Sequence, residues 1–275
     1  MVENLAAIPP ADESSTGRLT RRRLLVTSGA ILGALAGCSS APKQEAPEKT
    51  AKAALPDQVV PFSTHIPNGE LPQGWKPSAT WLATKRTQYR SVAASNKTVL
   101  HALSEEGASA VYCDVRIPEE AAGRIRWSWK VDKLIPDADV GVSERDDAVA
   151  RVLVNLGPNG KKLSFRDMLF REQAALFAGV EFPHSVLTYV WDPKHPVGTV
   201  LNIKETSRVR YLVVESGPER LGQWLEYDRD FQADFNMVFK GETSGQVNSV
   251  GVTTDSNNTF STAEAWYGDL QLGRA

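Results

Sequence analysis

The segment from Trp224 to Asp230 carries residue types that could do acid–base chemistry. Alternate side chains of an extended strand point to one side, so Glu226, Asp228 and Asp230 are expected on one face. The same alternation places Trp224 beside them. Successive carboxylates would lie about 7 Å apart, near the separation of paired acids in glycoside hydrolysis. The segment therefore offers either a ligand-binding face (Trp224, Glu226, Asp228) or a catalytic set (Glu226, Asp228, Asp230).

Neighbouring arginines argue against proton donation from this strand. Arg229 follows Asp228 directly, and a guanidinium favours the ionised form of a carboxyl group and lowers its pKa. A general acid needs a raised pKa instead. We therefore expect Asp230 to be a structural partner of an arginine and no acid–base pair to exist on this strand. A solvated acidic face opposite buried apolar residues is equally compatible with the pattern.

A second polar group lies around Arg151. Arg151 alternates with Val149 and Leu153 on one strand face, so it is expected to be partly buried and to need a carboxylate. The prediction is a set of structural ion pairs, formed across strands between this region and the previous one, among Asp146, Asp147, Arg151, Arg229 and Asp230. The alternative is a polar cluster at the floor of a ligand groove.

Metal and cofactor motifs are sparse. Asp255, in a loop rich in Asn, and Asp269 could supply hard oxygen ligands to calcium, although the same loop is also a typical polar turn. The four histidines have no metal-ligand spacing. The chain has no nucleophile elbow, phosphate loop or dinucleotide fingerprint. We expect no cofactor, with calcium at Asp255 and Asp269 as the alternative.

Composition narrows the classes further. The 275 residues are 41 % hydrophobic and 23 % charged, which is an ordinary globular balance. A net charge of −2 gives no electrostatic reason to expect a nucleic-acid partner. Two cysteines cannot form a disulfide framework, and Cys113, which alternates with valines, is expected to be an inert core thiol.

The N-terminus has the features of an export signal. Arg21 and Arg22 precede an apolar run of 13 residues, which is too short to span a membrane but suits a signal peptide. The paired arginines resemble a twin-arginine signal, and export of an unfolded chain is the alternative. The run ends in Leu35-Ala36-Gly37-Cys38, which resembles a bacterial lipobox. We expect residues 1–37 to be removed and Cys38 to be lipidated, anchoring the protein to the membrane.

The remainder divides into a tether and one domain. Residues 38–56 are rich in Ala, Pro, Lys, Glu and Ser without apolar periodicity, so they are expected to form a flexible tether. Residues 57–275 are expected to form a single domain in the cell envelope, facing the periplasm or the exterior. Alternating apolar and polar residues predict strands here, for example in 124–131, 148–156, 186–191 and 247–254.

These patterns predict an all-β fold, an antiparallel β-sandwich or jelly roll with two short helices packed on it. One helix begins after Ser164, ends before Gly179 and presents Phe165, Met168, Leu169, Leu176 and Phe177 on one side; the other covers 233–240. Both are expected to act as lids on the sandwich core. Trp127 and Trp129, which share an apolar strand face, are expected in that core.

An ordered set of short motifs resembles a known family. The set is Trp127-Ser128-Trp129, Asp146-Asp147-Ala148 with Arg151, Leu187-Thr188-Tyr189-Val190-Trp191, Val213-Val214-Glu215-Ser216-Gly217, Trp224, Glu226, Arg229-Asp230, Asp234, Asp255-x-Asn257-Asn258-Thr259 and Ala265-Trp266-Tyr267-Gly268-Asp269. In this order it resembles the bacterial domain of unknown function 3047, over roughly 75–272. The resemblance implies a secreted or lipid-anchored β-sandwich. It implies no reaction and no catalytic residues.

The sequence thus favours a lipid-anchored, non-catalytic binding protein of the cell envelope, with a glycan as its ligand. A glycoside hydrolase that uses a carboxylate pair is the first alternative. A structural envelope protein without a small ligand is the second.

Overall fold

The computed structural model describes residues 54–79, 83–94, 96–178 and 181–274. The predicted signal peptide, with Arg21, Arg22 and Cys38, and most of the predicted tether lie outside the described residues. Those expectations therefore stay predictions. Within the described residues, no helix combines the length and the apolar character needed to cross a membrane.

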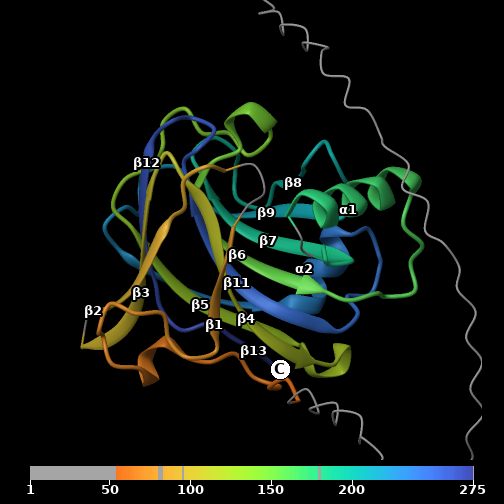
Figure 1. Ribbon diagram of the computed structural model, residues 1–275, viewed down its shortest axis with the longest axis horizontal. Coiled ribbons are helices and arrows are strands. Elements are labelled where there is room, and N and C mark those ends of the chain that lie inside the picture. Colours follow the sequence, from red (N-terminus) through yellow and green to blue (C-terminus); the bar gives the residue numbers. More distant parts are fainter. Residues whose placement is uncertain (1–53, 80–82, 95, 179–180, 275) are drawn as a thin grey trace, which may run out of the picture. The chain divides into compact units, whose positions relative to one another are not determined.

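Thirteen strands of the described chain form two sheets (Figure 1). The first has seven strands, in the spatial order β1 (Trp75–Ala79), β4 (Ala108–Ile117), β11 (Val247–Asp255), β6 (Ala148–Leu156), β7 (Ser185–Asp192), β9 (Val209–Ser216) and β8 (Val200–Asn202). The second has the order β10 (Trp224–Asp230), β5 (Arg124–Val131), β12 (Thr262–Tyr267), β3 (Lys97–Glu105) and β2 (Gln88–Ala94), with β13 (Gln271–Gly273) also paired to β5. The all-β sandwich prediction is confirmed.

One strand pair departs from the predicted antiparallel arrangement. β7 and β9 are parallel, with Val186 opposite Val209, because β8 intervenes between them in the chain and lies on the far side of β9. Every side chain of β7 is buried, as is usual for a strand covered on both faces. The continuous apolar run of this strand, without polar alternation, follows from that double burial.

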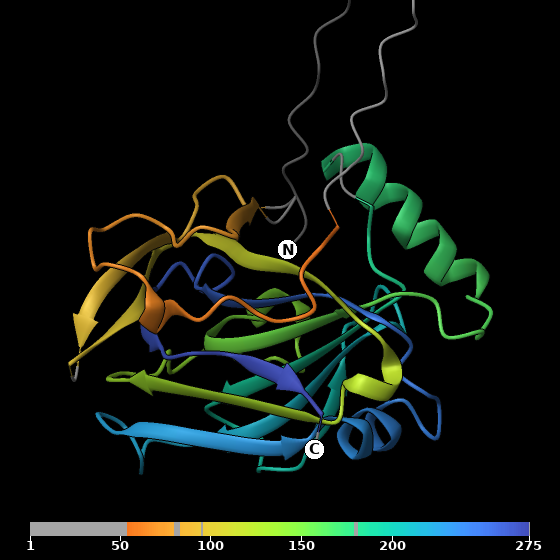
Figure 2. The same ribbon diagram turned by 90° about the horizontal axis from the view of Figure 1, so that it is seen from below.

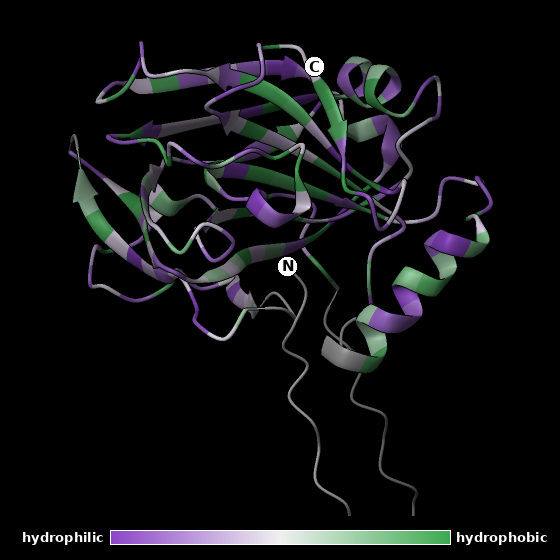
Figure 3. Ribbon diagram, turned by 90° about the horizontal axis from the view of Figure 1, so that it is seen from above, coloured by the Kyte–Doolittle hydropathy of each residue, from purple (hydrophilic) through white to green (hydrophobic). Residues whose placement is uncertain are grey.

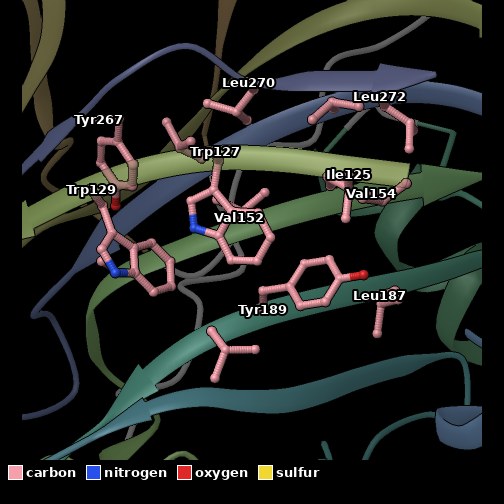
Figure 4. Close-up of a cluster of buried hydrophobic side chains, with 14 of the residues drawn as sticks. Ile125, Trp127, Trp129, Val152, Val154, Leu187, Tyr189, Tyr267, Leu270 and Leu272 are labelled. Carbon is pink, nitrogen blue, oxygen red and sulfur yellow. The ribbon is translucent and has the colours of Figure 1, made fainter. Parts of the chain in front are cut away.

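The core lies between the facing sheets and is rich in aromatic rings. Trp127 and Trp129 of β5 point inward, which confirms their predicted burial. Trp127 lies 4.9 Å from the ring of Tyr189 on the opposite sheet, and Trp129 lies 6.3 Å from Trp191. Figure 4 shows the two tryptophans of β5 facing the strand that carries Tyr189. The main core cluster of the described chain is formed by side chains between Val59 and Leu272, all of which lie within residues 57–275.

Two α-helices and three short 3-10 helices complete the described chain: α1 (Phe165–Ala178), α2 (Phe231–Val238), η1 (Phe62–Thr64), η2 (Glu119–Ala121) and η3 (Ser143–Arg145). The helix α2 directly follows β10 and buries Phe231 and Phe235 in the main core. It begins two residues before the predicted start because Asp230 caps it: the Asp230 carboxylate accepts from the Ala233 backbone N–H at 2.9 Å.

The helix α1 differs from its predicted orientation. Four of the side chains predicted to face the sandwich, Phe165, Met168, Leu169 and Leu176, are exposed, whereas Phe170 and Ala174 pack inward. Figure 2 shows α1 standing beside the sandwich rather than lying flat across a sheet face. The lid prediction was wrong for α1 because the helix carries apolar residues on two opposite sides, and the sequence pattern does not say which side packs.

Candidate functional site

A groove of about 780 Å³ lies on the outer face of the six-stranded sheet, where β10, β5 and the turn between β12 and β13 meet the β2–β3 hairpin. We call it the sheet groove. It is lined by Ser63, Ala94, Lys97, Thr98, Val99, Arg126, Trp127, Ser128, Trp224, Glu226, Tyr227, Asp228, Gly268, Asp269 and Gln271. The three ligand-binding candidates of the acidic strand are among these residues.

Strand alternation positions the outward side chains of the groove. In β10, Leu225 is buried while Trp224 is half-buried and Glu226 and Asp228 are exposed. Register places Glu226 opposite Ser128 and Asp228 opposite Arg126, so these four groups form two adjacent rows across β10 and β5. The period-two pattern of both strands therefore dictates which polar groups reach the groove.

Glycine at position 268 shapes the groove floor. The Gly268 N–H donates to the Ser128 carbonyl at 2.9 Å, where the chain leaves β12 and runs along β5 toward β13. A Cβ at this position would lie 2.1 Å from the Ser128 hydroxyl oxygen. Glycine is therefore needed for the turn to pass this close to β5 and leave the space open.

A row of aromatic and cationic side chains runs across the same sheet from Trp224, which lines the groove, to Lys130 and Trp266, which do not. Trp224 and Trp266 each lie opposite Lys130 on neighbouring strands, so the two indoles sit two strands apart, about 10 Å. The Lys130 ammonium lies 4.9 Å from the centroid of the Trp266 ring, and His101 stacks on that ring at 5.2 Å. Both indoles are half-buried and face outward, unlike the buried tryptophans of the core.

The two groove carboxylates of β10 differ in their surroundings. Asp228 accepts from Arg124 Nε at 2.7 Å and also pairs with Arg126 Nε at 3.1 Å. These contacts, that of Arg124 above all, hold the pKa of Asp228 below its ordinary value. Glu226 is exposed and has no hydrogen bond or ion pair within the described part of the chain. Asp228 is thus an ionised carboxylate fixed in place, and Glu226 is an open one.

This arrangement does not suit acid catalysis by Asp228. A general acid of a glycosidase needs a carboxyl whose pKa is raised by a poorly solvated site. The pKa of Asp228 is lowered instead, and Asp230 is occupied as the cap of α2. Of the alternative catalytic set, only Glu226 is both in the groove and unpaired within the described residues.

The family comparison agrees with the motif order of the sequence. A family described as protein of unknown function, DUF3047, matches residues 73–271. The chain belongs to this family. No curated protein is found to match the sequence.

Solved structures similar to this DUF3047 chain are distant in sequence. The K1 cleaved adhesin domain of Lys-gingipain from Porphyromonas gingivalis W83 is 12 % identical, with 79 % of this chain and 98 % of that chain covered and a TM-score of 0.34. TmCBM27, a carbohydrate-binding module that recognises mannan, is 11 % identical, with 82 % and 99 % covered and a TM-score of 0.33. Endoglucanase 3 of Trichoderma harzianum, from family GH12, is 9 % identical, with 74 % and 99 % covered and a TM-score of 0.34. Likeness at this level carries no functional argument.

A second polar cluster of this DUF3047 chain is buried in the other sheet. Arg151 donates to Asp255 and to Asp146, both at 2.7 Å. The hydroxyl of Tyr211 donates to Asp146 at 2.8 Å, and the Ala148 N–H donates to Asp255 at 3.0 Å. Burial raises the pKa of Asp255 to about 7, against the opposing effect of Arg151. We call these groups the buried cluster.

The predicted pairing between the two polar regions is wrong. Arg229 forms a two-point ion pair with Asp234 at 2.7 Å rather than with Asp230, and Arg151 pairs within its own sheet. β6 and β10 belong to different sheets, so the two sets do not meet as cross-strand neighbours. Asp147 also has another role: its carboxylate accepts from the N–H and hydroxyl of Thr259 and fixes that loop.

The carboxylates of the alternative calcium site are engaged separately. Asp255 is held by Arg151, and Asp269 accepts from the N–H of Ser63 at 2.8 Å and from its hydroxyl at 2.5 Å. In the part of the chain that the structure describes, no three His, Cys, Asp or Glu side chains are grouped so as to hold a metal ion. Cys113 is a buried free thiol in β4.

Several outward residues of the groove and of the strands beside it were not singled out from the sequence as site residues. One of them is Trp266. It alternates with the buried Ala265 and Tyr267 in β12, and this alternation is the signal that could have identified it as an outward residue. Arg126, Ser128 and Lys130 carry the same signal, since they alternate with the inward Trp127 and Trp129. What alternation alone does not give is that these outward residues lie beside β10.

Proposed function

We propose that this protein is a lipid-anchored binding protein of the cell envelope and that the sheet groove holds a glycan. The observation that carries the proposal is the outward, half-buried indole of Trp224, which lines an open polar groove beside two carboxylates, Glu226 and Asp228. The apolar face of a sugar ring stacks on such an indole.

Open polar groups beside the indole would give the groove its specificity. Glu226 and Ser128 lie opposite each other on the neighbouring strands β10 and β5, and their side chains have no hydrogen-bond partner within the described residues. A carboxylate and a hydroxyl in this position can accept from and donate to ring hydroxyls. Asp228, fixed by Arg124 and Arg126, adds an acceptor whose position is already ordered, which reduces the entropy lost on binding.

Screening of glycans against residues 38–275 with Cys38→Ser tests the groove, because this chain keeps all core residues and cannot be lipidated. We expect Trp224→Ala to weaken binding at least tenfold, which is about 1.4 kcal/mol, because this indole lines the groove. Glu226→Gln should weaken it as well. Phe260→Ala is the matched control, because Phe260 is an exposed ring outside the sheet groove. Binding of no glycan, or equal loss in the control, would contradict the proposal.

The same samples separate binding from hydrolysis. We expect the bound oligosaccharide to remain intact, because Arg124 and Arg126 hold the pKa of Asp228 below its ordinary value, whereas a general acid needs a raised pKa, and Asp230 caps α2. New reducing ends that appear with the wild-type domain and disappear with Glu226→Gln would replace the binding function with a glycoside hydrolase.

The anchor is tested by fractionation of cells that express the full chain. We expect Cys38→Ala to leave the protein unprocessed or to release it from the membrane fraction, because it lacks the thiol that would be lipidated. Replacement of Arg21 and Arg22 by Lys should block export on a twin-arginine route. Normal processing and membrane retention of the Cys38→Ala variant would contradict the proposed lipid anchor.

A further inference from the structure

The helix α1 carries a row of exposed apolar side chains on the side that faces away from the domain. Phe165 is 78 % exposed, Leu176 77 %, Leu169 48 % and Met168 47 %. With 3.6 residues per turn, Phe165, Leu169 and Leu176 lie within about 40° of each other around the helix axis. We call these four side chains the α1 ridge. Figure 3 shows α1 beside the sandwich, with hydrophobic residues along its length.

The opposite side of α1 fixes the helix in this orientation. Phe170 packs edge-to-face on Phe182 at 5.0 Å. The buried carboxylate of Asp167 accepts from the Thr206 hydroxyl at 2.6 Å and from the Ser207 N–H at 2.8 Å. These contacts hold the inner face against the domain, so the α1 ridge cannot turn inward without breaking them. Its exposure is therefore built into the fold.

Charge around the ridge favours an anionic surface. Lys161 and Lys162 precede the helix, Arg166 lies in its first turn, and all three are exposed. Glu172 is exposed and falls on the ridge side itself, between Met168 and Leu176 around the helix axis. Arg171 lies 3.9 Å from Glu181 beyond the helix. The cations gather at the N-terminal end of the ridge, beside Phe165, as in helices that lie in the plane of a membrane surface.

The size of the ridge argues against a second copy as its partner. Four side chains, two of them half exposed, offer on the order of 400 Å², whereas each partner of a standard protein interface contributes about 800 Å². A bilayer sets no such minimum, because apolar side chains insert singly into the boundary between headgroups and acyl chains. The basic flank would also repel its own copy.

The start of the domain supports the same orientation. In Figure 2 the first described residues, in orange, and α1 lie toward the same side of the domain. The described residues begin at residue 54, so the 15 residues 39–53 separate that point from Cys38. The tether that the composition predicts would have, at this length, a mean reach of roughly 21 Å, and a lipid on Cys38 would then keep this side near the bilayer.

We propose that α1 is a membrane-contact helix whose ridge inserts into an anionic lipid surface, with Lys161 and Lys162 at the headgroups. The inference rests on the proposed lipid anchor, which supplies the proximity. The helix then adds the second, weaker attachment that a single lipid signal needs for stable anchoring. It also orients the domain, because α1 is rigidly held by its inner face.

The test is co-sedimentation of residues 38–275, carrying Cys38→Ser, with vesicles of phosphatidylglycerol and phosphatidylcholine at 3:7. We expect binding at millimolar lipid that falls on vesicles of phosphatidylcholine alone and at high salt. The triple variant Phe165→Ser, Leu169→Ser, Leu176→Ser should lose at least tenfold in partitioning. Phe260→Ser is the control, because Phe260 is as exposed as Phe165 but lies on another surface.

A single-site probe keeps the test independent of the triple variant's folding. Leu169→Cys, labelled with an environment-sensitive fluorophore, should show a blue-shifted emission that brominated lipids quench, whereas the same label on Phe260→Cys should show neither effect; Cys113 is buried. Absence of vesicle binding by the unsubstituted domain, or a dimer that the triple variant abolishes, would overturn the proposal. Since no acyl chain is present, this result is separate from the Cys38→Ala experiment, and unchanged glycan binding by the triple variant would leave the groove proposal standing.

Discussion

The sheet groove and the buried cluster contain the same residue types in different roles. Each brings arginines and carboxylates together on neighbouring strands. In the buried cluster, Arg151 binds Asp146 and Asp255, and Tyr211 and backbone N–H groups complete the set. In the groove, Glu226 stays unpaired among the described residues and faces solvent. A carboxylate removed from water must be paired, whereas one that water reaches can stay available to a ligand.

The largest expected effect comes from breaking the buried cluster. Arg151→Met leaves Asp146 and Asp255 buried without their cation, so we expect a loss of about 3–5 kcal/mol in the free energy of unfolding. Arg126→Met is the matched control in the groove, since Arg126 is half exposed and its partner Asp228 keeps Arg124. Urea unfolding measures both variants. Equal shifts of the urea midpoint in the two variants would contradict the distinction between a structural and an open polar region.

The pH dependence of stability sharpens the same comparison. The pKa of Asp255 is about 7 in the folded protein and 3.8 ordinarily, because burial disfavours the carboxylate. The folded state thus binds this proton more tightly than the unfolded state does. The stability that the bound proton contributes is fully present below pH 4 and is lost as the pH rises through 7. We expect the free energy of unfolding to fall from pH 5 to 7, by at most about 1.4 kcal/mol per pH unit. Asp255→Asn should flatten this slope in urea titrations at each pH.

A smaller effect is expected at the end of the acidic strand. Asp230→Ala removes the cap of α2, which typically costs about 1 kcal/mol. Asp228→Ala, two residues earlier on the same face, is expected to leave the unfolding midpoint unchanged because Asp228 is solvated. Thermal unfolding followed by circular dichroism distinguishes the two. A larger loss for Asp228→Ala would mean that the groove carboxylate supports the fold rather than a ligand.

The alternation of apolar and polar residues in the sequence predicted most of the fold. The alternation in 124–131 and 148–156 predicted β5 and β6 to the residue or nearly so, because inward apolar and outward polar side chains leave a period of two. The short edge strand β8 and the hairpin of β2 and β3 were not predicted. In β8 every side chain, and in β2 every side chain but one, is exposed or half-buried, so apolar periodicity is weak in these two strands. The parallel pairing of β7 and β9 depends on where β8 packs, which no local pattern contains.

The sequence by itself determined which residues of each strand face outward, that Trp127 and Trp129 lie in the core, and that Trp224, Glu226 and Asp228 share a face. These follow from the backbone geometry of a single strand. Only the tertiary structure decided which partners they meet: Asp255 reaches Arg151 from 104 residues away, Trp266 joins Trp224 through β5, and the inner face of α1 excludes the ridge from the core. Periodicity specifies direction, whereas strand order and helix docking specify neighbours, and it is the neighbours that separate a structural carboxylate from one open to a ligand.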